Sequence, residues 1–385
     1  MSTNDTKLSD LSPTQVASDK DSSAATAIAP VSVCSNNDNE TITGDALIVN
    51  ISLAQYDKMR MVNTPAKKPR NNTAFCQIEQ NNLYVHFPHY MQFILPCWSF
   101  FQMQAKETNI IVVPDAKYRG RSTFQTGIND ILLKLGIQIE TSSTMGPYLG
   151  QGNNSSSVSI GYYDGFFMAS PAHAKEFRRQ FMAALGLVAG NNLGSIVESS
   201  AVPQLSDQTA PKIAILNREK SRRLMNVDAI AKAIQEELNM EDTVAVVDFA
   251  NATFKDQVKF FSEHDIVISP HGAQLAGIIF MPQNGAIFEL FPFGYILERY
   301  FGSLTTSIGL EHAYTFETNG DPAEETAFWG ANYERRVVAR SRNLCPSVTK
   351  IVEGVKLLVR NWRKRHRDYI ATTQGISVDK TEPNS

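Results

Sequence analysis

Short apolar runs alternate with amphipathic segments between residues 211 and 316. The runs are apolar at consecutive positions, which is typical of strands buried on both faces of a parallel sheet. The segments between them place apolar residues three and four apart, as amphipathic helices do, and Asn226 and Thr253 stand where N-caps are expected. The predicted strands are 212–216, 243–249, 265–269, 286–291 and 312–316, with a helix over 296–308 before the last. This alternation predicts an α/β domain with helices on both faces of its sheet.

A weaker form of the same alternation begins near residue 80. Proline disfavours helix interiors, so the apolar helix after the first strand is expected to be broken or kinked at Pro96. Residues 150–159 are predicted as a flexible loop, and residues 189–210, which lack periodicity, as an interdomain linker. The strands predicted here are 83–87 and 109–115, and the helices are 90–104, 124–135 and 172–186.

The two ends of the chain differ from this alternating centre. Residues 1–75 are rich in Ser, Thr, Asp and Asn, so they are predicted to be a mobile tail or stem, apart from one short strand near 47–51. A last helix over 347–369 has an apolar face and a basic far end, which either complements the helix dipole or binds an anionic lipid or polymer. The predicted organisation is a disordered stem (1–78), two α/β domains (79–205 and 206–340), a C-terminal helix (341–370) and a flexible tail (371–385).

Composition narrows the classes of protein that fit. Of the 385 residues, 43% are apolar and 9% are aromatic, which excludes a wholly disordered chain. A net charge of −3 gives no global attraction to nucleic acid or to a membrane. Four cysteines without a CxxC pair do not predict a disulfide scaffold or a zinc site, and whether Cys76 and Cys97 pair stays open. The sequence has no uncharged apolar stretch of about 18 residues, so a transmembrane helix is not predicted.

The N-terminus and the sequons point to different compartments. Residues 1–32 lack the apolar segment of a signal peptide, so either the protein stays in the cytosol or the sequence has lost a leader. The Asn-x-Ser/Thr sequons either arise by chance in an Asn- and Ser-rich chain or mark a secreted protein. The sequon asparagines are Asn4, Asn39, Asn50, Asn71, Asn153, Asn154 and Asn251.

Polar residues follow the predicted strands of the second domain at their carboxyl ends, where parallel sheets bind ligands. Arginines offer paired donors to phosphate oxygens, and a helix that begins near Gly272 directs N–H groups at an anion. A carboxylate within an apolar strand is costly unless it is paired, and Glu289 could accept hydrogen bonds from ribose hydroxyls. The candidate residues are Arg218, Arg222, Arg223, Asp248, His271, Gly272, Ala273 and Glu289. Together they predict a nucleotide diphosphate site.

Each candidate also has an ordinary structural interpretation. A histidine after a strand, such as His271, is often a turn or core residue. Arg222 and Arg223 could instead belong to a solvated helix start, close to acidic neighbours.

Two segments, 215–226 and 254–292, together resemble the glycosyltransferase family 61 domain. The likeness rests on an arginine followed by a second arginine cluster, an Asn-initiated helix, a Gln–Val helix, an HGA turn, a Phe-x-x-Pro and a Glu-x-x-Pro. The matching residues are Arg218, Arg222, Arg223, Asn226, Gln257, Val258, His271, Gly272, Ala273, Phe280, Pro282, Glu289 and Pro292. The family often has Ser where this chain has Asn217, and Ser or Thr and then Asn where it has Ala276 and Gly277.

The resemblance implies a GT-B architecture, in which two Rossmann-like domains face each other across a cleft. It also implies an inverting transfer from a UDP-sugar of the xylose, GlcNAc or arabinose class to a glycan or glycoprotein hydroxyl. The first domain would hold the acceptor and the second the donor. The Golgi or endoplasmic reticulum lumen is the implied compartment, and the cytoplasm is expected instead if the chain has no leader. Membrane contact is expected only through an N-terminal anchor, and nucleic acid is not an expected partner.

Catalysis without a metal ion or cofactor is expected if Arg218, Arg222 or Arg223, His271 and the Gly272–Ala273 amides stabilise the departing diphosphate. The one Asp-x-Asp, at 19–21, lies in the predicted tail. His86 is the favoured base because of its intrinsic pKa, and Asp115 and Glu289 are rivals. The alternative function is a non-catalytic module that binds a nucleotide sugar or a glycan.

Overall fold

The computed structural model describes residues 73–78, 86–103, 108–114, 122–144, 156–160, 168, 170–187, 210–240, 244–317 and 333–373. All of these residues belong to one compact unit that spans 39–385. The predicted stem up to residue 72, most of the predicted linker, the strand near 47–51 and Asp115 lie outside the described residues.

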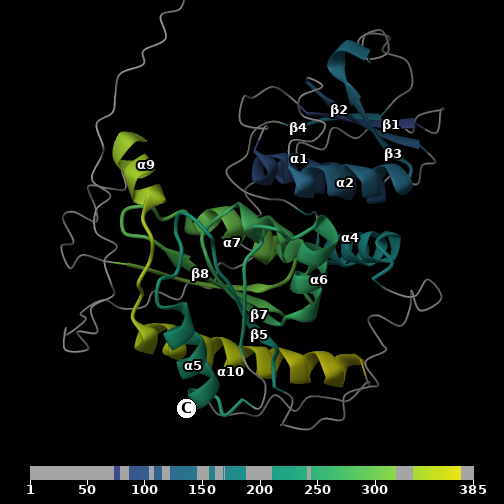
Figure 1. Cartoon of the computed structure of the whole chain (residues 1–385). Helices are drawn as coiled ribbons and strands as arrows, with labels where there is room; N and C mark the ends of the chain where they lie inside the picture. Colours follow the sequence, from purple (N-terminus) through teal and green to yellow (C-terminus); the bar gives the residue numbers. More distant parts are fainter. Residues whose placement is uncertain are drawn as a thin grey trace, which may run out of the picture. The chain divides into compact units, whose positions relative to one another are not determined.

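The first sheet is parallel and has the strand order β3-β2-β1-β4. Helices α1 and α2 lie along the same face of this sheet (Figure 1). Its strands are β1 (Thr73–Ile78), β2 (Thr108–Val113), β3 (Ile137–Thr141) and β4 (Ser156–Ile160), and its helices are α1 (Phe87–Met103), α2 (Thr123–Lys134) and α4 (Pro171–Ala184). The predictions of strand 109–115 and of helices 124–135 and 172–186 are confirmed within a few residues.

Other predictions for this region are wrong. His86 precedes α1 and Phe87 begins it, so the strand predicted over 83–87 is absent from its described part. Helix α1 is assigned without a break through Pro96, because burial along almost its whole length outweighs the cost of about 3 kcal/mol that a helical proline carries. Residues 156–160 form β4 rather than part of a loop, since pairing with the central strand β1 decides strand formation more than the weak propensity of serine.

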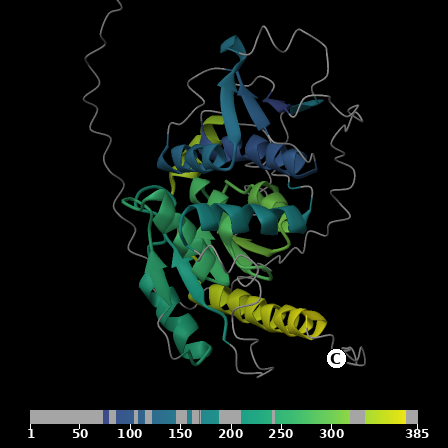
Figure 2. The same cartoon turned by 90° about the vertical axis from the view of Figure 1, so that its right-hand side faces the viewer.

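The second sheet is also parallel, with the order β6-β5-β7-β8-β9. Helices α5 and α10 cover one face, and α6 and α7 cover the other (Figures 1 and 2). The strands are β5 (Ile213–Leu216), β6 (Ala245–Val247), β7 (Ile266–Pro270), β8 (Ala286–Phe291) and β9 (Glu311–Phe316). The helices are α5 (Val227–Glu237), α6 (Phe254–Glu263), the 3-10 helix η5 (Ala273–Phe280), α7 (Glu298–Ser307), α9 (Tyr333–Ser341) and α10 (Val348–Thr373). Every strand and helix predicted here is confirmed, and α9 was not predicted.

Burial on both faces explains why β5 is an unbroken apolar run. Ile213 and Ile215 of β5 pack into a cluster with α5 and α10. Ala214 and Leu216 of the same strand join a second cluster, which also contains residues of α1, α2 and α4. The helices of the first sheet and those of the second therefore share one hydrophobic core.

A disulfide joins Cys76 of β1 to Cys97 of α1 and answers the question that the sequence left open. Cys345 is disulfide-bonded as well. Within the described part of the chain, no helix combines the length and the hydrophobicity needed to cross a membrane.

Candidate functional site

The order of strands creates a crevice at the carboxyl ends of β5 and β7. The chain passes from β5 through α5 to β6 on one side, and then returns through α6 to β7 on the other side of β5. The connections after β5 and β7 therefore diverge, and such a switch point is where open parallel sheets bind ligands. Arg218 and Arg222 follow β5, and His271 and Gly272 follow β7.

Asn217 organises the loop that follows β5. Its Oδ1 accepts hydrogen bonds from the backbone N–H groups of Arg218 and Leu224, both at 2.8 Å, and its Nδ2 donates to the carbonyl of Leu224 at 3.2 Å. The side chain is buried. An amide with both an acceptor and a donor thus closes this loop, which gives Asn217 a structural role at the position where the family often has Ser.

Arg218 reaches across the crevice toward the β7 side. Its Nε donates to the carbonyl of Ser221 at 2.7 Å, and its Nη1 lies so close to Gly272 that a Cβ there would overlap it. The backbone of Gly272 is extended, with a φ of 168°, so glycine is needed here for space and not for a left-handed conformation. Arg218 and His271 therefore border the same space.

Arg222 and Arg223 are adjacent in sequence but have different environments. Arg222 has a left-handed backbone, with a φ of 59°, and its side chain is only 5% exposed. Its guanidinium carbon lies 5.7 Å from the ring centroid of Tyr295. The side chain of Arg223 is exposed. Of the two arginines, only Arg222 joins Arg218 at the crevice.

Residues 342–344 hold the Arg222 loop in this conformation. The backbone N–H of Arg222 donates to the carbonyl of Arg342 at 3.0 Å, and Leu344 donates to the carbonyl of Arg223 at 2.8 Å. Leu224 and Leu344 also form a parallel β-bridge, and both are buried. The left-handed residue is thus fixed by a segment that follows α9.

No carboxylate of the described chain forms an ion pair with Arg218 or Arg222, and the buried Nε of Arg222 has no hydrogen-bond partner. Burial lowers the pKa of Arg218. Burial, together with the positive charge of Arg218, lowers the pKa of Arg222 to about 10. Buried cations without partners are costly, so this arrangement favours binding of an anion with more than one negative charge.

His271 is held by Glu289, which His312 also contacts. Nδ1 of His271 lies 2.6 Å from one carboxylate oxygen of Glu289, and Nε2 of His312 lies 2.9 Å from the other. Glu289 is fully buried, and both histidines are at most 4% exposed. An ionised carboxylate can only accept hydrogen bonds, so each of these nitrogens carries a proton and donates it. Among the described residues, Nε2 of His271 has no hydrogen-bond partner.

The pKa shifts agree with this assignment. Burial lowers the pKa of His271, and Arg218 and Arg222 lower it further, which outweighs the opposing effect of Glu289. Burial alone would raise the pKa of Glu289, but the two histidines reverse this and lower it. His271 is therefore neutral and Glu289 is ionised at neutral pH.

The start of α1 brings two further imidazoles toward the arginines. Nδ1 of His89 lies 3.0 Å from the hydroxyl of Tyr300, and the rings of Tyr300 and His271 are 6.3 Å apart. His86 is exposed, yet partial desolvation, His89 and three arginines lower its pKa to about 4. His86 therefore lies in the positive field of the site and is neutral at neutral pH.

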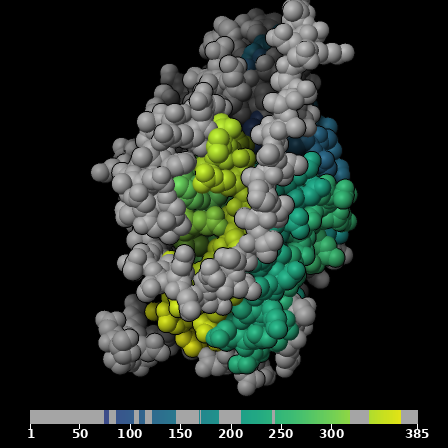
Figure 3. All heavy atoms as spheres, turned by 60° about the vertical axis from the view of Figure 1, so that its left-hand side comes forward, coloured from purple at the N-terminus to yellow at the C-terminus, as the bar shows by residue number. Residues whose placement is uncertain are grey.

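Arg340 of α9 is one of those three arginines, and sequence analysis missed it. Its charge lowers the pKa values of Arg218 and Arg222 as well as that of His86. Helix α9, yellow-green in Figure 3, lies at the surface of the face shown there, and Arg340 is exposed. No strand end precedes Arg340, so the rule that found the other residues could not find it. His312 was also missed, although a polar residue in a predicted apolar strand was the signal that singled out Glu289.

The predicted site residues divide into three groups. The structure brings together Arg218, Arg222, His271, Gly272 and Glu289, and places Ala273 at the start of η5. Arg223 and Asp248 do not join them, since both are exposed and Asp248 accepts a hydrogen bond from the N–H of Ala250 at 3.0 Å. His86 lies within the same positive field, and Asp115 lies outside the described residues.

Glu289 needs a corrected role. It was expected to bind ribose or to act as a rival base, but both carboxylate oxygens are already bonded to imidazoles and none of the side chain is exposed. Since it has no free oxygen to offer a substrate, Glu289 positions His271 instead.

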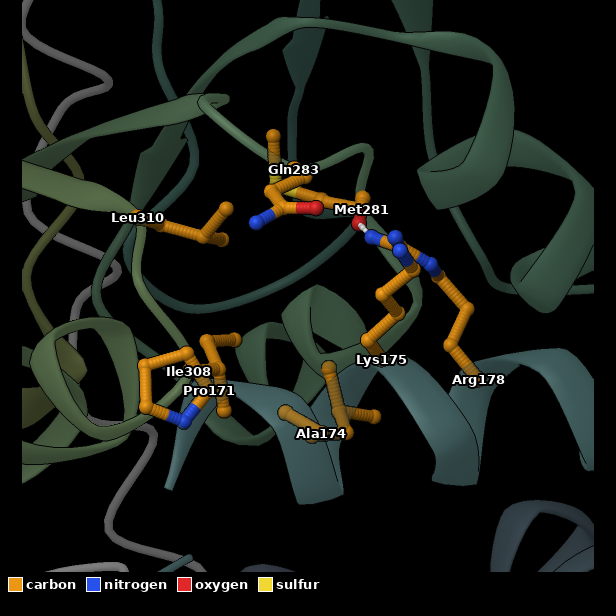
Figure 4. Close-up of a pocket in the computed structure, with 9 residues that line it drawn as sticks. Pro171, Ala174, Lys175, Arg178, Met281, Gln283, Ile308 and Leu310 are labelled. Carbon is orange, nitrogen blue, oxygen red and sulfur yellow. Dashed lines mark hydrogen bonds between the residues drawn. The ribbon is translucent and has the colours of Figure 1, made fainter. Parts of the chain in front are cut away.

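Two hollows elsewhere do not contain these residues. A cavity of about 10 Å³ lies between α4 and the segment after η5, where Arg178 donates to the carbonyl of Met281 (Figure 4). It has room for about one water molecule. A wider groove, of about 630 Å³, runs beside α2 and the start of α6 and is lined by hydroxyl groups, lysines and Phe254. Neither is lined by Arg218, Arg222 or His271.

Comparison with known proteins gives one family. The family described as Glycosyltransferase 61 matches residues 85–288, which is more than half of the chain. This range contains His86, Arg218, Arg222 and His271, whereas Glu289, His312 and Arg340 follow it.

Individual relatives match shorter segments. A protein O-linked-mannose beta-1,4-N-acetylglucosaminyltransferase 2 of Xenopus tropicalis is 29% identical over 133 residues, which are 34% of this chain and 23% of the relative. Its counterpart in Homo sapiens is 30% identical over 88 residues, covering 23% and 15%. An alpha-1,3-arabinosyltransferase of Oryza sativa subsp. japonica is 29% identical over 107 residues, covering 26% and 18%. The matched segments thus span less than a quarter of the length of these relatives.

Proposed function

The chain belongs to the glycosyltransferase 61 family, and from that premise we propose that it transfers a sugar from a nucleotide diphosphate sugar to a hydroxyl of a glycan or glycoprotein. The observation that carries this proposal is a pair of arginines, the half-buried Arg218 beside Gly272 and the buried Arg222, neither of which forms an ion pair with a carboxylate of the described residues. A diphosphate supplies the missing negative charge and accepts from both arginines.

UDP-sugars of the GlcNAc, xylose or arabinose class are the proposed donors. The names of the relatives include both GlcNAc transfer and arabinose transfer, so both a hexose and a pentose are candidates for the sugar of the donor. In the proposed GT-B arrangement the second sheet binds the donor, and the acceptor approaches from the first sheet, which carries His86.

The proposed chemistry is an inverting displacement. The acceptor oxygen attacks the anomeric carbon, the bond from that carbon to the β-phosphate oxygen breaks, and its electron pair stays on the departing diphosphate. Arg218 and Arg222 stabilise that charge, which is usually the largest catalytic contribution. Because they supply positive charge at this point, the proposed transfer does not depend on a metal ion, and activity should persist in EDTA.

His86 is the proposed base for the acceptor hydroxyl. It is neutral at neutral pH and can therefore take up a proton. Burial contributes most to its pKa of about 4, and the arginine charges lower it further; a bound diphosphate offsets these charges, which makes His86 a stronger base in the complex. His86→Gln should lower kcat by about 100-fold and leave the affinity for UDP close to that of the wild type. Asp115 remains a rival base.

A secretory compartment is the proposed location. Disulfides such as Cys76–Cys97 persist mainly in oxidising compartments. Asn251, the sequon asparagine in the described part of the chain, is exposed, as glycosylation requires.

The alternative of a non-catalytic binding module is not favoured. It rested on Ala276 and Gly277, which differ from the family pattern. Both are buried in η5, and a side chain at Gly277 would collide with Phe261. The difference therefore lies in the core and not in the crevice.

The adjacent arginines provide a matched test of the donor site. Arg222→Ala should weaken UDP binding by about 100-fold, and Arg218→Ala should do so by a similar amount, because each removes a charge-assisted donor. Arg223→Ala removes the same charge from an exposed position and should change affinity less than about threefold. Isothermal titration calorimetry with UDP measures all three, with thermal unfolding to verify the fold. Equal losses in Arg222→Ala and Arg223→Ala would contradict the donor site.

A further inference from the structure

The ring of His271 is fixed in a way that leaves only one nitrogen for a ligand. Nδ1 donates to Glu289, and the ring stacks on Phe291 with a centroid distance of 5.0 Å. The ring centroids of Tyr295 and Phe301 lie 5.4 and 5.5 Å from that of His271. Because this packing prevents the ring from turning over, Nε2 is the atom that meets whatever occupies the crevice.

Charged and titratable groups surround this ring on several elements. Arg218 and Arg222, from the loop after β5, act on it with positive charge. Glu289 of β8 lies against Nδ1 of this ring and is itself shared with His312 of β9. Two tyrosines, Tyr295 after β8 and Tyr300 of α7, border the ring, and the hydroxyl of Tyr300 lies 3.0 Å from Nδ1 of His89 of α1.

We propose that binding of the nucleotide diphosphate is coupled to the uptake of one proton from solvent by Nε2 of His271. This inference rests on the proposed function, since it needs a diphosphate at the arginine pair. Burial is the main reason that the pKa of the free imidazole is low, and the guanidiniums of Arg218 and Arg222 lower it further; bound phosphates neutralise these guanidiniums and leave the opposing effect of Glu289 in place. The resulting imidazolium then has an ionised acceptor at each nitrogen, Glu289 at Nδ1 and a phosphate oxygen at Nε2, and such charge-assisted bonds are about twice as strong as neutral ones.

Calorimetry measures this proton directly. UDP is titrated into the full-length protein at pH 7.5 in buffers with different enthalpies of ionisation, and the dependence of the heat on the buffer gives the number of protons taken up. UDP is almost fully ionised at this pH, because the last phosphate pKa is about 6, so any proton enters the protein. We expect about one proton per UDP bound in the wild type. Affinity should fall up to about tenfold per pH unit above the pKa of the free imidazole.

Three histidine variants assign the proton. His271→Gln should bind UDP more weakly and with almost no proton uptake. His86→Gln and His89→Gln, which change imidazoles near the same arginines, should keep the uptake. Proton uptake that persists in His271→Gln would overturn the inference, and its loss in His86→Gln instead would assign the proton to that residue.

Two further outcomes separate this inference from the proposed function. Tight UDP binding by the wild type without proton uptake would overturn the inference alone, whereas a folded wild type that does not bind UDP would overturn both. If His271→Gln does not fold, NMR of the wild type with ¹⁵N-labelled imidazoles replaces it. His271 should then change from singly to doubly protonated on addition of UDP, and an unchanged ring would overturn the inference.

Discussion

The two sheets of this protein differ in the charge that they bury. In the described part of the first sheet and its helices, the buried polar side chains are the neutral Gln92, Ser99, Gln125 and Thr141. The second sheet and its loops bury ionisable groups, among them Arg222, His271, Glu289, Glu311 and His312. Both regions have parallel sheets covered by amphipathic helices, so the fold itself does not require these charges.

This difference points to the carboxyl edge of the second sheet. Glu311 has a structural explanation, because Arg365 and Asn361 of α10 both bond to its carboxylate. Within the described part of the chain, Arg222 has no such carboxylate partner, and it keeps a left-handed backbone that costs energy in a residue other than glycine. Burial lowers the pKa of Arg222 more than Tyr295 and Glu289 raise it, so its charge is only partly compensated, which is the basis of the proposed anion site.

The largest expected effect comes from removing the carboxylate at the centre of the buried cluster. Glu289→Ala leaves both His271 and His312 without an acceptor, and breaking a buried group of this kind typically costs about 3–5 kcal/mol in the free energy of unfolding. Urea denaturation measures it. Ser99→Ala is the counterpart in the first region, where a neutral hydroxyl donates to Met168 Sδ, and should cost under about 1 kcal/mol. Similar losses in the two variants would contradict the contrast between the regions.

The first region has a covalent link instead. Replacing both Cys76 and Cys97 by Ala opens a loop with a sequence separation of 21 residues and should lower the free energy of unfolding by about 3 kcal/mol. The affinity of the folded protein for UDP should stay within about twofold, because the arginine pair lies in the other region. Denaturation curves and calorimetry measure the two quantities. A large loss of UDP affinity with unchanged stability would mean that the disulfide shapes the site.

The helix caps test a feature that the regions share. Ser122 caps α2 by accepting from the N–H of Gln125, and Thr253 caps α6 by accepting from the N–H of Asp256. Ser122→Ala and Thr253→Ala should each cost about 1 kcal/mol of stability. Since Thr253 also completes a sequon, the comparison uses protein made without glycosylation, with Asn251→Gln as the control that should change little. A loss in only one helix would show that the regions differ in more than buried charge.

Sequence predicted the second region well because its strands are buried on both faces. Apart from Ser269 and Glu289, the residues of β7 and β8 are apolar, so these strands can be recognised without knowing their neighbours in the fold. β1 and β4 contain polar residues, and their strand conformation depends on pairing with neighbours distant in sequence, which no local pattern records.

The sequence predicted which residues gather at this edge of the sheet, but not the contacts that each of them makes. The strand-end rule found Arg218, His271 and Glu289, because parallel strands bring their carboxyl ends to one edge. The rule could not predict that Arg222 is buried and Arg223 exposed. That difference depends on the left-handed backbone of Arg222, which hydrogen bonds to residues 342–344 hold in place. The same rule could not show that the oxygens of Glu289 were already bonded to His271 and His312.

The smallest expected effect concerns a second carboxyl group near the Arg222 loop. Burial raises the pKa of Glu317 to about 7, although the backbone N–H of Cys345 donates to it. A carboxyl whose pKa is higher in the folded state binds more protons when folded, so its contribution to stability falls as the pH rises from the ordinary value of 4.5 to about 7. Glu317→Gln should therefore match the wild type near pH 4 and be more stable at pH 8. The gain should stay under about 1 kcal/mol because the side chain is partly exposed. Urea denaturation at the two pH values measures this difference. A gain that is equal at both would mean that the pKa of Glu317 does not change on folding, which would contradict the shift that burial is expected to cause.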